Sequence, residues 1–226
     1  MSKRHQALIF DLDGIVVDSE RIELEMRRQP FKDHGLDFDL ETYLTTIGSS
    51  VRFEHLPEVK ELIHIGKWES IDQMSLETRA RSRAATIKEG LMAGVRDAMD
   101  WAKAHGVRLG LGSSSANKWV LPVLEGVGIL HEFEAVVTSD DVPVGKAKPA
   151  PDIFLKVLEL LDTQPEDALV LEDSYNGVQA ACAAGIRVVA IPNAVTHVQD
   201  FSKATEIIPS MRELELEKYF PQAVKQ

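Results

Sequence analysis

The sequence predicts an α/β fold, a doubly wound, Rossmann-like parallel sheet that carries a smaller inserted α-helical domain. Three observations predict it. Several short runs are apolar on successive residues, as strands are when helices cover both faces of a sheet. Helix-like segments separate most of these runs. One long stretch after the first run breaks the alternation, and a chain of 226 residues has room for a core domain with an insert.

Strands and helices alternate along most of the chain. The runs expected to form buried strands are Ala7–Phe10, Val107–Leu111, Ala135–Val137, Ala168–Leu171 and Val188–Ile191. The helices expected between them are Val95–His105, one capped by Asn117 and kinked by Pro122, Asp152–Leu161 and Ser174–Ala184. Glycines directly after the first and last of these helices are typical stop signals, and Pro151 is a typical start signal.

The long stretch after the first strand contains several helix-like segments and no convincing buried strand. The helices expected in it are Glu20–Arg28, Leu40–Thr46, Glu54–Ile65 and Gln73–Lys88. About 70 residues is far more than one crossover connection needs. The expected division is therefore a core of residues 1–18 and 88–226 and an inserted helical domain of residues 19–87.

The charge of the chain limits its partners. The formal net charge is −11 and the sequence pI is about 5.1. A surface of this charge repels nucleic acid, so we expect no nucleic-acid partner. It also repels small phosphate esters, and a phosphate site here therefore needs positive charge concentrated locally.

Cysteine content and hydropathy indicate the compartment. Cys182 is the single cysteine, which excludes an internal disulfide and fits a reducing compartment. It lies in an alanine-rich run, where we expect a small core residue. No stretch reaches the ~20 apolar residues of a membrane span, and the first apolar run is too short for a signal peptide. We expect a cytoplasmic protein without a membrane partner.

Chemically active residues follow the predicted strands. Asp11–Gly14 comes after the first strand, Ser113–Ser115 after the second and Glu172–Ser174 after the fourth. Lys148 stands just before the helix that leads into the fourth strand. Each segment alone is more often a polar loop, a helix cap or a surface lysine. Ligands bind at the carboxyl ends of strands in open α/β sheets, so the four together predict one site.

These residue types suit phosphoryl transfer. Acids held this close repel one another unless a cation neutralises them, and an all-oxygen site favours Mg²⁺. Asp11 is placed to attack phosphorus, while Asp13 is placed to protonate the leaving alkoxide and then deprotonate water. The Ser113 hydroxyl and the Lys148 ammonium would hold the phosphoryl oxygens.

Four sequence stretches together carry a family resemblance. They are Leu8–Gly14 with Asp18–Glu20, Leu111–Ser115, Lys148–Phe154 and Leu171–Gly177. The chain resembles the haloacid dehalogenase superfamily, in the branch of β-phosphoglucomutase-like sugar-phosphate phosphatases, and the helical insert stands where that branch carries its cap domain. Lys148, rather than Lys146, matches the family lysine because it directly precedes Pro149–Asp152.

The resemblance implies a set of metal ligands. Mg²⁺ would be held by the Asp11 side chain, the Asp13 backbone carbonyl and Asp173. Glu172 would support the metal directly or through water. The same resemblance implies that Asp11 is the nucleophile and Asp13 the acid and base.

Further residues are candidates for contacts to the substrate. Gly48–Arg52 resembles a substrate-facing cap loop, in which Arg52 would contact a second phosphate or a sugar hydroxyl; a solvated arginine is the alternative. Ser114 and Asn117, beside Ser113, are the remaining candidates.

The expected function is Mg²⁺-dependent hydrolysis of small phosphate monoesters, of sugars or polyols, by a monomer or weak homodimer. The alternative enzyme is a hexose phosphomutase, which in this branch has a histidine where this chain has Glu23. A phosphoaspartate signalling protein and a non-catalytic phospho-ligand-binding protein are alternatives from another class.

Overall fold

A computed structural model describes residues 5–41, 57–66, 68–221 and 223. The chain forms two compact units, one of Met1–Asp18 with Gly90–Gln226 and the other of Ser19–Glu89. Most of the predicted helix Leu40–Thr46, the start of the predicted helix Glu54–Ile65, and the whole of Gly48–Arg52 lie outside the described residues.

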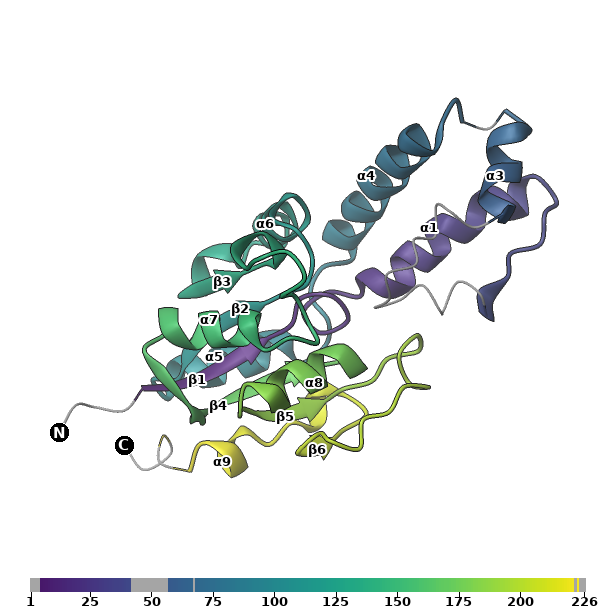
Figure 1. The fold of residues 1–226 in the computed structure, drawn as a ribbon. Coiled ribbons are helices and arrows are strands. Elements are labelled where there is room, and N and C mark those ends of the chain that lie inside the picture. Colours follow the sequence, from purple (N-terminus) through teal and green to yellow (C-terminus); the bar gives the residue numbers. More distant parts are fainter. Residues whose placement is uncertain (1–4, 42–56, 67, 222, 224–226) are drawn as a thin grey trace. The chain divides into compact units, whose positions relative to one another are not determined.

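The described part of the larger unit contains a six-stranded sheet in the order β3-β2-β1-β4-β5-β6 (Figure 1). All neighbouring strands run parallel. The strands are β1 (His5–Phe10), β2 (Arg108–Gly112), β3 (Ala135–Val137), β4 (Thr163–Glu172), β5 (Arg187–Ala190) and β6 (Glu206–Ile207). This sheet confirms the predicted α/β fold class. The two-residue edge strand β6 was not predicted, because it has no buried apolar run.

Helices cover both faces of this sheet (Figure 1). They are α5 (Val95–Ala104), α6 (Asn117–Gly126), α7 (Asp152–Leu160), α8 (Tyr175–Ala183) and the short α9 (Leu216–Tyr219), with 3-10 turns at Leu130–Glu132, Ser139–Asp141 and Met211–Glu213. Leu8 and Phe10 share an apolar cluster with α5, α6 and α9, whereas Ala7 and Ile9 share one with α7 and α8. Successive side chains of β1 therefore enter opposite layers, which explains its continuous apolar run.

Two local predictions were wrong. Ala116, not Asn117, is the N-cap of α6, and it makes no side-chain capping hydrogen bond. Asn117 is its first residue, and its backbone N–H is instead satisfied by the Asp140 carboxylate at 2.8 Å. Cys182 is exposed rather than buried. In α8 the buried alanines are Ala180 and Ala181 with Ala184 just beyond, and the helical period turns Cys182 to the other face.

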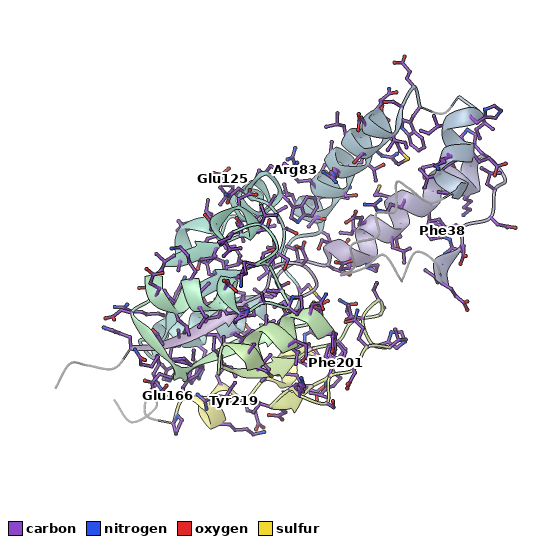
Figure 2. The ribbon with its side chains drawn as sticks, viewed as in Figure 1. Phe38, Arg83, Glu125, Glu166, Phe201 and Tyr219 are labelled. Atoms are coloured by element: carbon purple, nitrogen blue, oxygen red, sulfur yellow. The ribbon has the colours of Figure 1, made fainter. Side chains whose placement is uncertain are left out.

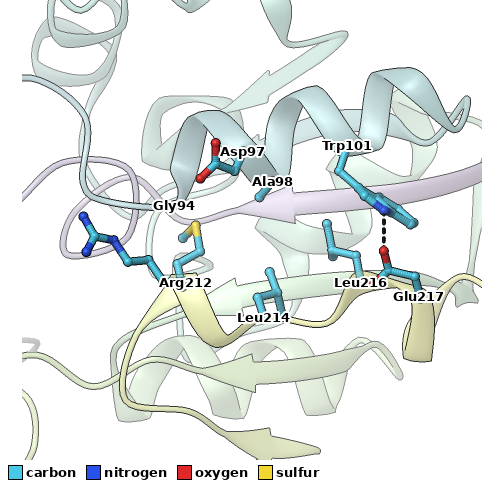
Figure 3. A pocket seen from close by; sticks show the side chains of 9 residues that line it. Gly94, Asp97, Ala98, Trp101, Arg212, Leu214, Leu216 and Glu217 are labelled. Atoms are coloured by element: carbon cyan, nitrogen blue, oxygen red, sulfur yellow. Dashed lines mark hydrogen bonds between the residues drawn. The ribbon is translucent and has the colours of Figure 1, made fainter.

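The segment Met211–Glu217 packs against α5 in the larger unit. A cavity of about 160 Å³ lies between the start of α5 and the segment Met211–Glu217 (Figure 3). The Trp101 indole N–H donates to Glu217 at 2.8 Å across it. Tyr219, labelled in Figure 2, donates its hydroxyl to Glu206 and so ties α9 to β6.

The smaller unit is helical in its described part. It contains α1 (Ser19–Asp33), α3 (Pro57–His64) and α4 (Ile71–Glu89). Among its described residues, the apolar core consists of Phe31, Val59, Leu62, Trp68 and Met74. Phe38, labelled in Figure 2, packs edge-on against Phe31 with ring centroids 5.3 Å apart. In the described part of the chain, no helix combines the length and apolar character needed to cross a membrane.

Candidate active site

The predicted acids lie at the point where the strand order of the sheet reverses. The first strand, β1, lies between β2 and β4, and Phe10 pairs with both Leu111 and Leu171. Asp11 extends this pairing, since its backbone N–H donates to the Leu171 carbonyl at 3.0 Å. The carboxyl ends of the three central strands therefore coincide, and a crevice at such a switch point is the usual ligand site of an open α/β sheet.

Lys148 joins two of the predicted carboxylates. Its Nζ lies 2.5 Å from Asp11 Oδ1 and 2.6 Å from Glu172 Oε1. The three side chains are 4%, 9% and 1% exposed, respectively. The loop before α7 thus brings a positive charge to the ends of β1 and β4, as the sequence predicted.

Burial and charge shift the pKa values of this pair. Burial raises the pKa of Asp11 to about 8, the nearby Glu172 and Asp13 carboxylates add to the rise, and Lys148 opposes it. Burial lowers the pKa of Lys148, but the charges and hydrogen bonds of Asp11 and Glu172 outweigh it and raise that pKa above its ordinary value. Lys148 is therefore firmly protonated, whereas Asp11 ionises less readily than a solvated aspartate because it is buried and has other carboxylates nearby.

Glu172 is held by donors at both oxygens. Besides Lys148 at Oε1, its Oε2 accepts from the backbone N–H of Asp173 and Ser174 at 3.0 Å each and from the Ser174 hydroxyl at 2.9 Å. The start of α8 packs directly on this carboxylate, because a Cβ at Gly177 would stand 1.7 Å from Oε1. This arrangement favours a supporting role for Glu172 over direct contact with a metal.

Asp173 lies against the turn that follows Asp11. Gly14 has φ +84°, and a Cβ there would stand 2.1 Å from Asp173 Oδ2. The same oxygen accepts from Asn193 Nδ2 at 2.6 Å. Glycine at position 14 therefore permits both the turn and the close approach of this carboxylate.

The Asp13 carboxylate is bound by two donors from the segment after β2. Ser115 Oγ donates to Oδ2 at 2.7 Å, and Trp119 Nε1 donates to Oδ1 at 2.9 Å. Asp13 itself is half-buried. It thus lies at the site with Asp11, and its side chain is oriented by residues about a hundred positions away in the sequence.

The remaining candidates for substrate contacts differ in burial and in their hydrogen-bond partners. Ser113 is buried directly after β2, and its Oγ accepts from the Ser115 backbone N–H at 3.0 Å. Ser114 is exposed, and the described contact of Asn117 is its backbone bond to Asp140. Arg52 lies outside the described residues. Lys146 is exposed, in contrast to Lys148.

Sequence reasoning missed three polar residues of the site: Ser115, Trp119 and Asn193. Asn193 follows the fifth strand, so the rule that located the other groups at strand ends would have found it. Ser115 was part of a segment already singled out, but its partner was not predicted. Nothing in the local pattern identifies Trp119, because a tryptophan in the first turn of a helix is ordinarily a packing residue.

The donor set suits a divalent cation. Four carboxylates, those of Asp11, Asp13, Glu172 and Asp173, follow β1 and β4, and Lys148 pairs with two of them, Asp11 and Glu172. Within the described residues, no group of three or more His, Cys, Asp or Glu side chains is arranged to hold a metal by side chains alone. The expected ligand set fits this finding, since it has only two carboxylate side chains, one backbone carbonyl and positions left for water. Such a set is typical of Mg²⁺.

The parallel sheet with helices on both faces, and the carboxylates and lysine at its strand-order reversal, define a doubly wound α/β protein with a candidate active site. The chain belongs to the haloacid dehalogenase-like hydrolase family, whose model matches residues 8–191. The predicted family, fold and hydrolase class of enzyme are thereby confirmed.

Known proteins similar to the chain agree with this assignment. It is 35% identical over 211 residues to YhcW of Bacillus subtilis (strain 168), with 93% of the chain and 94% of the relative covered. It is 33% identical over 182 residues to a phosphorylated carbohydrates phosphatase of Thermotoga maritima, with 80% and 82% covered. A crystal structure of CbbY from Rhodobacter sphaeroides in complex with phosphate is 26% identical with a TM-score of 0.70, covering 93% and 96%.

Proposed function

We propose that the chain hydrolyses small phosphate monoesters of sugars or polyols, with Mg²⁺, through a phosphorylated Asp11. The buried Lys148, in contact with both Asp11 and Glu172 at the strand-order reversal, carries the proposal. A lysine at this position both orients the nucleophile and brings the local positive charge that a phosphate ester needs at an acidic protein surface.

The first step transfers the phosphoryl group. An Asp11 carboxylate oxygen attacks phosphorus, the bond between phosphorus and the ester oxygen breaks, and its electron pair goes to the leaving alkoxide. Asp13 gives its proton to that oxygen, so the alcohol leaves neutral. The position of Asp13, two residues after Asp11, supports this division of roles.

The second step restores the enzyme. Water attacks phosphorus while Asp13, now a carboxylate, takes a proton from it. The bond between phosphorus and the Asp11 oxygen breaks, inorganic phosphate forms, and Asp11 becomes a carboxylate again. Asp13 therefore acts first as acid and then as base.

Two donors have capacity for the phosphoryl oxygens. The Lys148 ammonium has three N–H groups, of which Asp11 and Glu172 use two. The Ser113 hydroxyl accepts from the Ser115 N–H, which leaves its own proton for donation. Both groups are buried, where hydrogen bonds to developing charge are strongest.

Mg²⁺ would be held by Asp11, the Asp13 carbonyl and Asp173, and when bound it supplies positive charge that screens the carboxylates from the phosphate. The excess of carboxylates over lysine supports this assignment. Glu172 supports the site from behind through its hydrogen bonds with Lys148, Asp173 and Ser174.

The substrate class rests on the family and on one relative in particular. The Thermotoga maritima protein is named a phosphorylated carbohydrates phosphatase. By analogy, the helical unit of Ser19–Glu89 is the part that selects the ester, with Arg52 as a candidate contact. A cytoplasmic location and a monomeric or weakly dimeric state remain predictions.

The phosphomutase alternative has less support. Glu23 takes the place of the histidine that the mutases carry, and it accepts a hydrogen bond from Arg27 Nε at 2.9 Å within the same helix. Incubation with a hexose 1-phosphate and a trace of its bisphosphate separates the two activities, since a mutase yields the 6-phosphate and a hydrolase yields inorganic phosphate.

A phosphate-release screen of phosphorylated metabolites, with and without Mg²⁺, tests the proposal. We expect Asp11→Asn to lower turnover by at least about 10³-fold, because the neutral amide of asparagine cannot act as the nucleophile. Asp97→Asn, on the surface of α5, is the matched control and should keep full activity. Full turnover by Asp11→Asn, or by the wild-type protein in excess chelator, would overturn the mechanism.

A further inference from the structure

The Asp13 carboxylate has a defined donor at each oxygen. Trp119 Nε1 donates to Oδ1 at 2.9 Å, and Ser115 Oγ donates to Oδ2 at 2.7 Å. A carboxylate bound at one oxygen can still rotate about that bond. Bound at both, it has a single orientation, and the two oxygens are no longer equivalent.

The segment that carries these donors is itself fixed. The Ser115 backbone N–H donates to Ser113 Oγ at 3.0 Å, and its carbonyl accepts from the Ser139 N–H at 3.1 Å. The Asn117 N–H is bound by Asp140 at 2.8 Å, and the buried Val120 anchors the first turn of α6 in the apolar core. A donor on such a platform positions its partner more exactly than one on a free loop.

The two donors differ in what they can do. An indole N–H only donates, so Oδ1 remains an acceptor whether or not Asp13 carries a proton. A serine hydroxyl both donates and accepts, so Ser115 can turn its proton away when Oδ2 is protonated. The two oxygens of Asp13 therefore have different partners, a fixed donor at Oδ1 and an adaptable hydroxyl at Oδ2.

We propose that Trp119 is a positioning residue for Asp13, and that its indole N–H at Oδ1, together with the Ser115 hydroxyl at Oδ2, holds the carboxylate in the orientation that proton transfer needs. This inference rests on the proposed function of Asp13 as acid and base. Trp119 does not itself act on the reacting atoms; it acts through the orientation of Asp13.

The dependence of rate on the leaving group tests the inference. The quantity kcat/KM covers the steps up to departure of the alcohol. 4-Nitrophenyl phosphate loses its phenolate without needing a proton, whereas phenyl phosphate has a more basic leaving group that does. For Trp119→Phe we expect kcat/KM to fall about tenfold on phenyl phosphate, a part of the 10²–10⁴-fold that acid catalysis contributes, and less than about twofold on 4-nitrophenyl phosphate.

Trp101→Phe is the matched control. Trp101 also donates its indole N–H to a carboxylate, that of Glu217 at 2.8 Å, in the same unit but at the surface of α5 (Figure 3). Its loss should leave kcat/KM unchanged on both substrates. Equal falls on both substrates for Trp119→Phe, or no fall on either, would overturn the positioning role.

A second measurement observes the contact directly and does not need the Trp119→Phe enzyme to fold. The protein has three tryptophans, and their ¹⁵N-labelled indole groups give separate signals that Trp68→Phe and Trp101→Phe assign by elimination. Asp13→Asn should shift the Trp119 signal and leave that of Trp101 in place. An unmoved Trp119 signal would contradict the contact.

Failure of this inference is distinguishable from failure of the proposed function. If the wild-type protein releases no phosphate from either ester, the proposed function fails. If it turns over both esters and Asp13→Asn is impaired, but Trp119→Phe keeps the wild-type leaving-group dependence, only the inference about Trp119 fails.

Discussion

Two clusters of charged side chains in the larger unit are built in opposite ways. At the surface, the single carboxylate of Glu132 meets two cations, Arg96 at 2.8 Å and Lys103. In the site, the single ammonium of Lys148 meets two carboxylates, those of Asp11 and Glu172, and the nearby Asp13 adds further negative charge. The two cations of the first cluster lower the pKa of its carboxylate. In the second, burial raises the pKa of Asp11 to about 8, Glu172 and Asp13 add to the rise, and Lys148 opposes it.

The comparison shows that the Glu132 cluster is arranged to stabilise the fold, whereas the cluster around Lys148 is arranged as a site for chemistry would be. Glu132 joins α5 to the 3-10 turn Leu130–Glu132, and its charge is fully matched within the protein. The buried carboxylates around Asp11 destabilise the fold unless a cation completes the site. Perturbed groups gathered at a strand-order reversal mark a functional site on physical grounds.

The largest effect on stability and activity is expected from the removal of Lys148. Lys148→Met keeps an unbranched chain of similar length but leaves Asp11 and Glu172 buried without their cation. We expect the free energy of unfolding to fall by about 3 kcal/mol, as for other buried pairs that lose one partner, together with nearly all activity. Urea unfolding and phosphate release measure the two effects. Lys146→Met, two residues away and exposed, should change neither; a Lys148→Met protein of wild-type stability would show that the buried contacts are not formed.

A smaller effect is expected from Gly177, which packs on Glu172. A Cβ there would stand 1.7 Å from Oε1, so Gly177→Ala must displace the carboxylate or the start of α8. We expect a loss of about 1–3 kcal/mol and lower activity, since Glu172 holds Lys148.

Gly128→Ala is the control for the Gly177→Ala variant. Gly128 has φ +79° and open space around its Cα, so alanine there costs only backbone strain of about 1–2 kcal/mol and should leave activity intact. Thermal unfolding and kcat distinguish the two glycines. Equal activity in both variants would argue against a role for Glu172 in supporting Lys148.

The smallest effect is expected at Glu132. Burial alone would raise its pKa, but the hydrogen bonds and charges of Lys103 and Arg96 lower it below its ordinary value of 4.5. The pKa of Glu132 is lower in the folded protein than in the unfolded chain. Its ion pairs therefore stabilise the fold fully above about pH 4.5, and this stabilisation is lost as pH falls through the folded pKa. Glu132→Gln should cost about 1 kcal/mol near neutral pH, since both cations are partly exposed, and progressively less in acid. A pH-independent difference in urea unfolding would contradict this account.

Much of the site could be predicted because strand ends obey a simple rule. Parallel strands place their carboxyl ends at one edge, so Asp11, Ser113 and Asp173 could be assigned to that edge from apolar runs alone. Lys148 was predicted from its position before a helix and from the family pattern. Residues without such a marker, above all Trp119, were missed, because the packing of α6 and not a local pattern places them.

The sequence by itself determined the alternation of buried strands and helices, the position of the acids after β1 and β4, and the excess of negative charge that requires a cation. Only the tertiary structure decided which oxygen meets which donor: Glu172 bound by Lys148 and its own loop, Asp173 by Asn193, and Asp13 by Ser115 and Trp119. The physical reason is that periodicity and strand order fix which residues reach an edge. Hydrogen bonds of under 3 Å between segments far apart in the chain depend on the final packing of the helices that carry them.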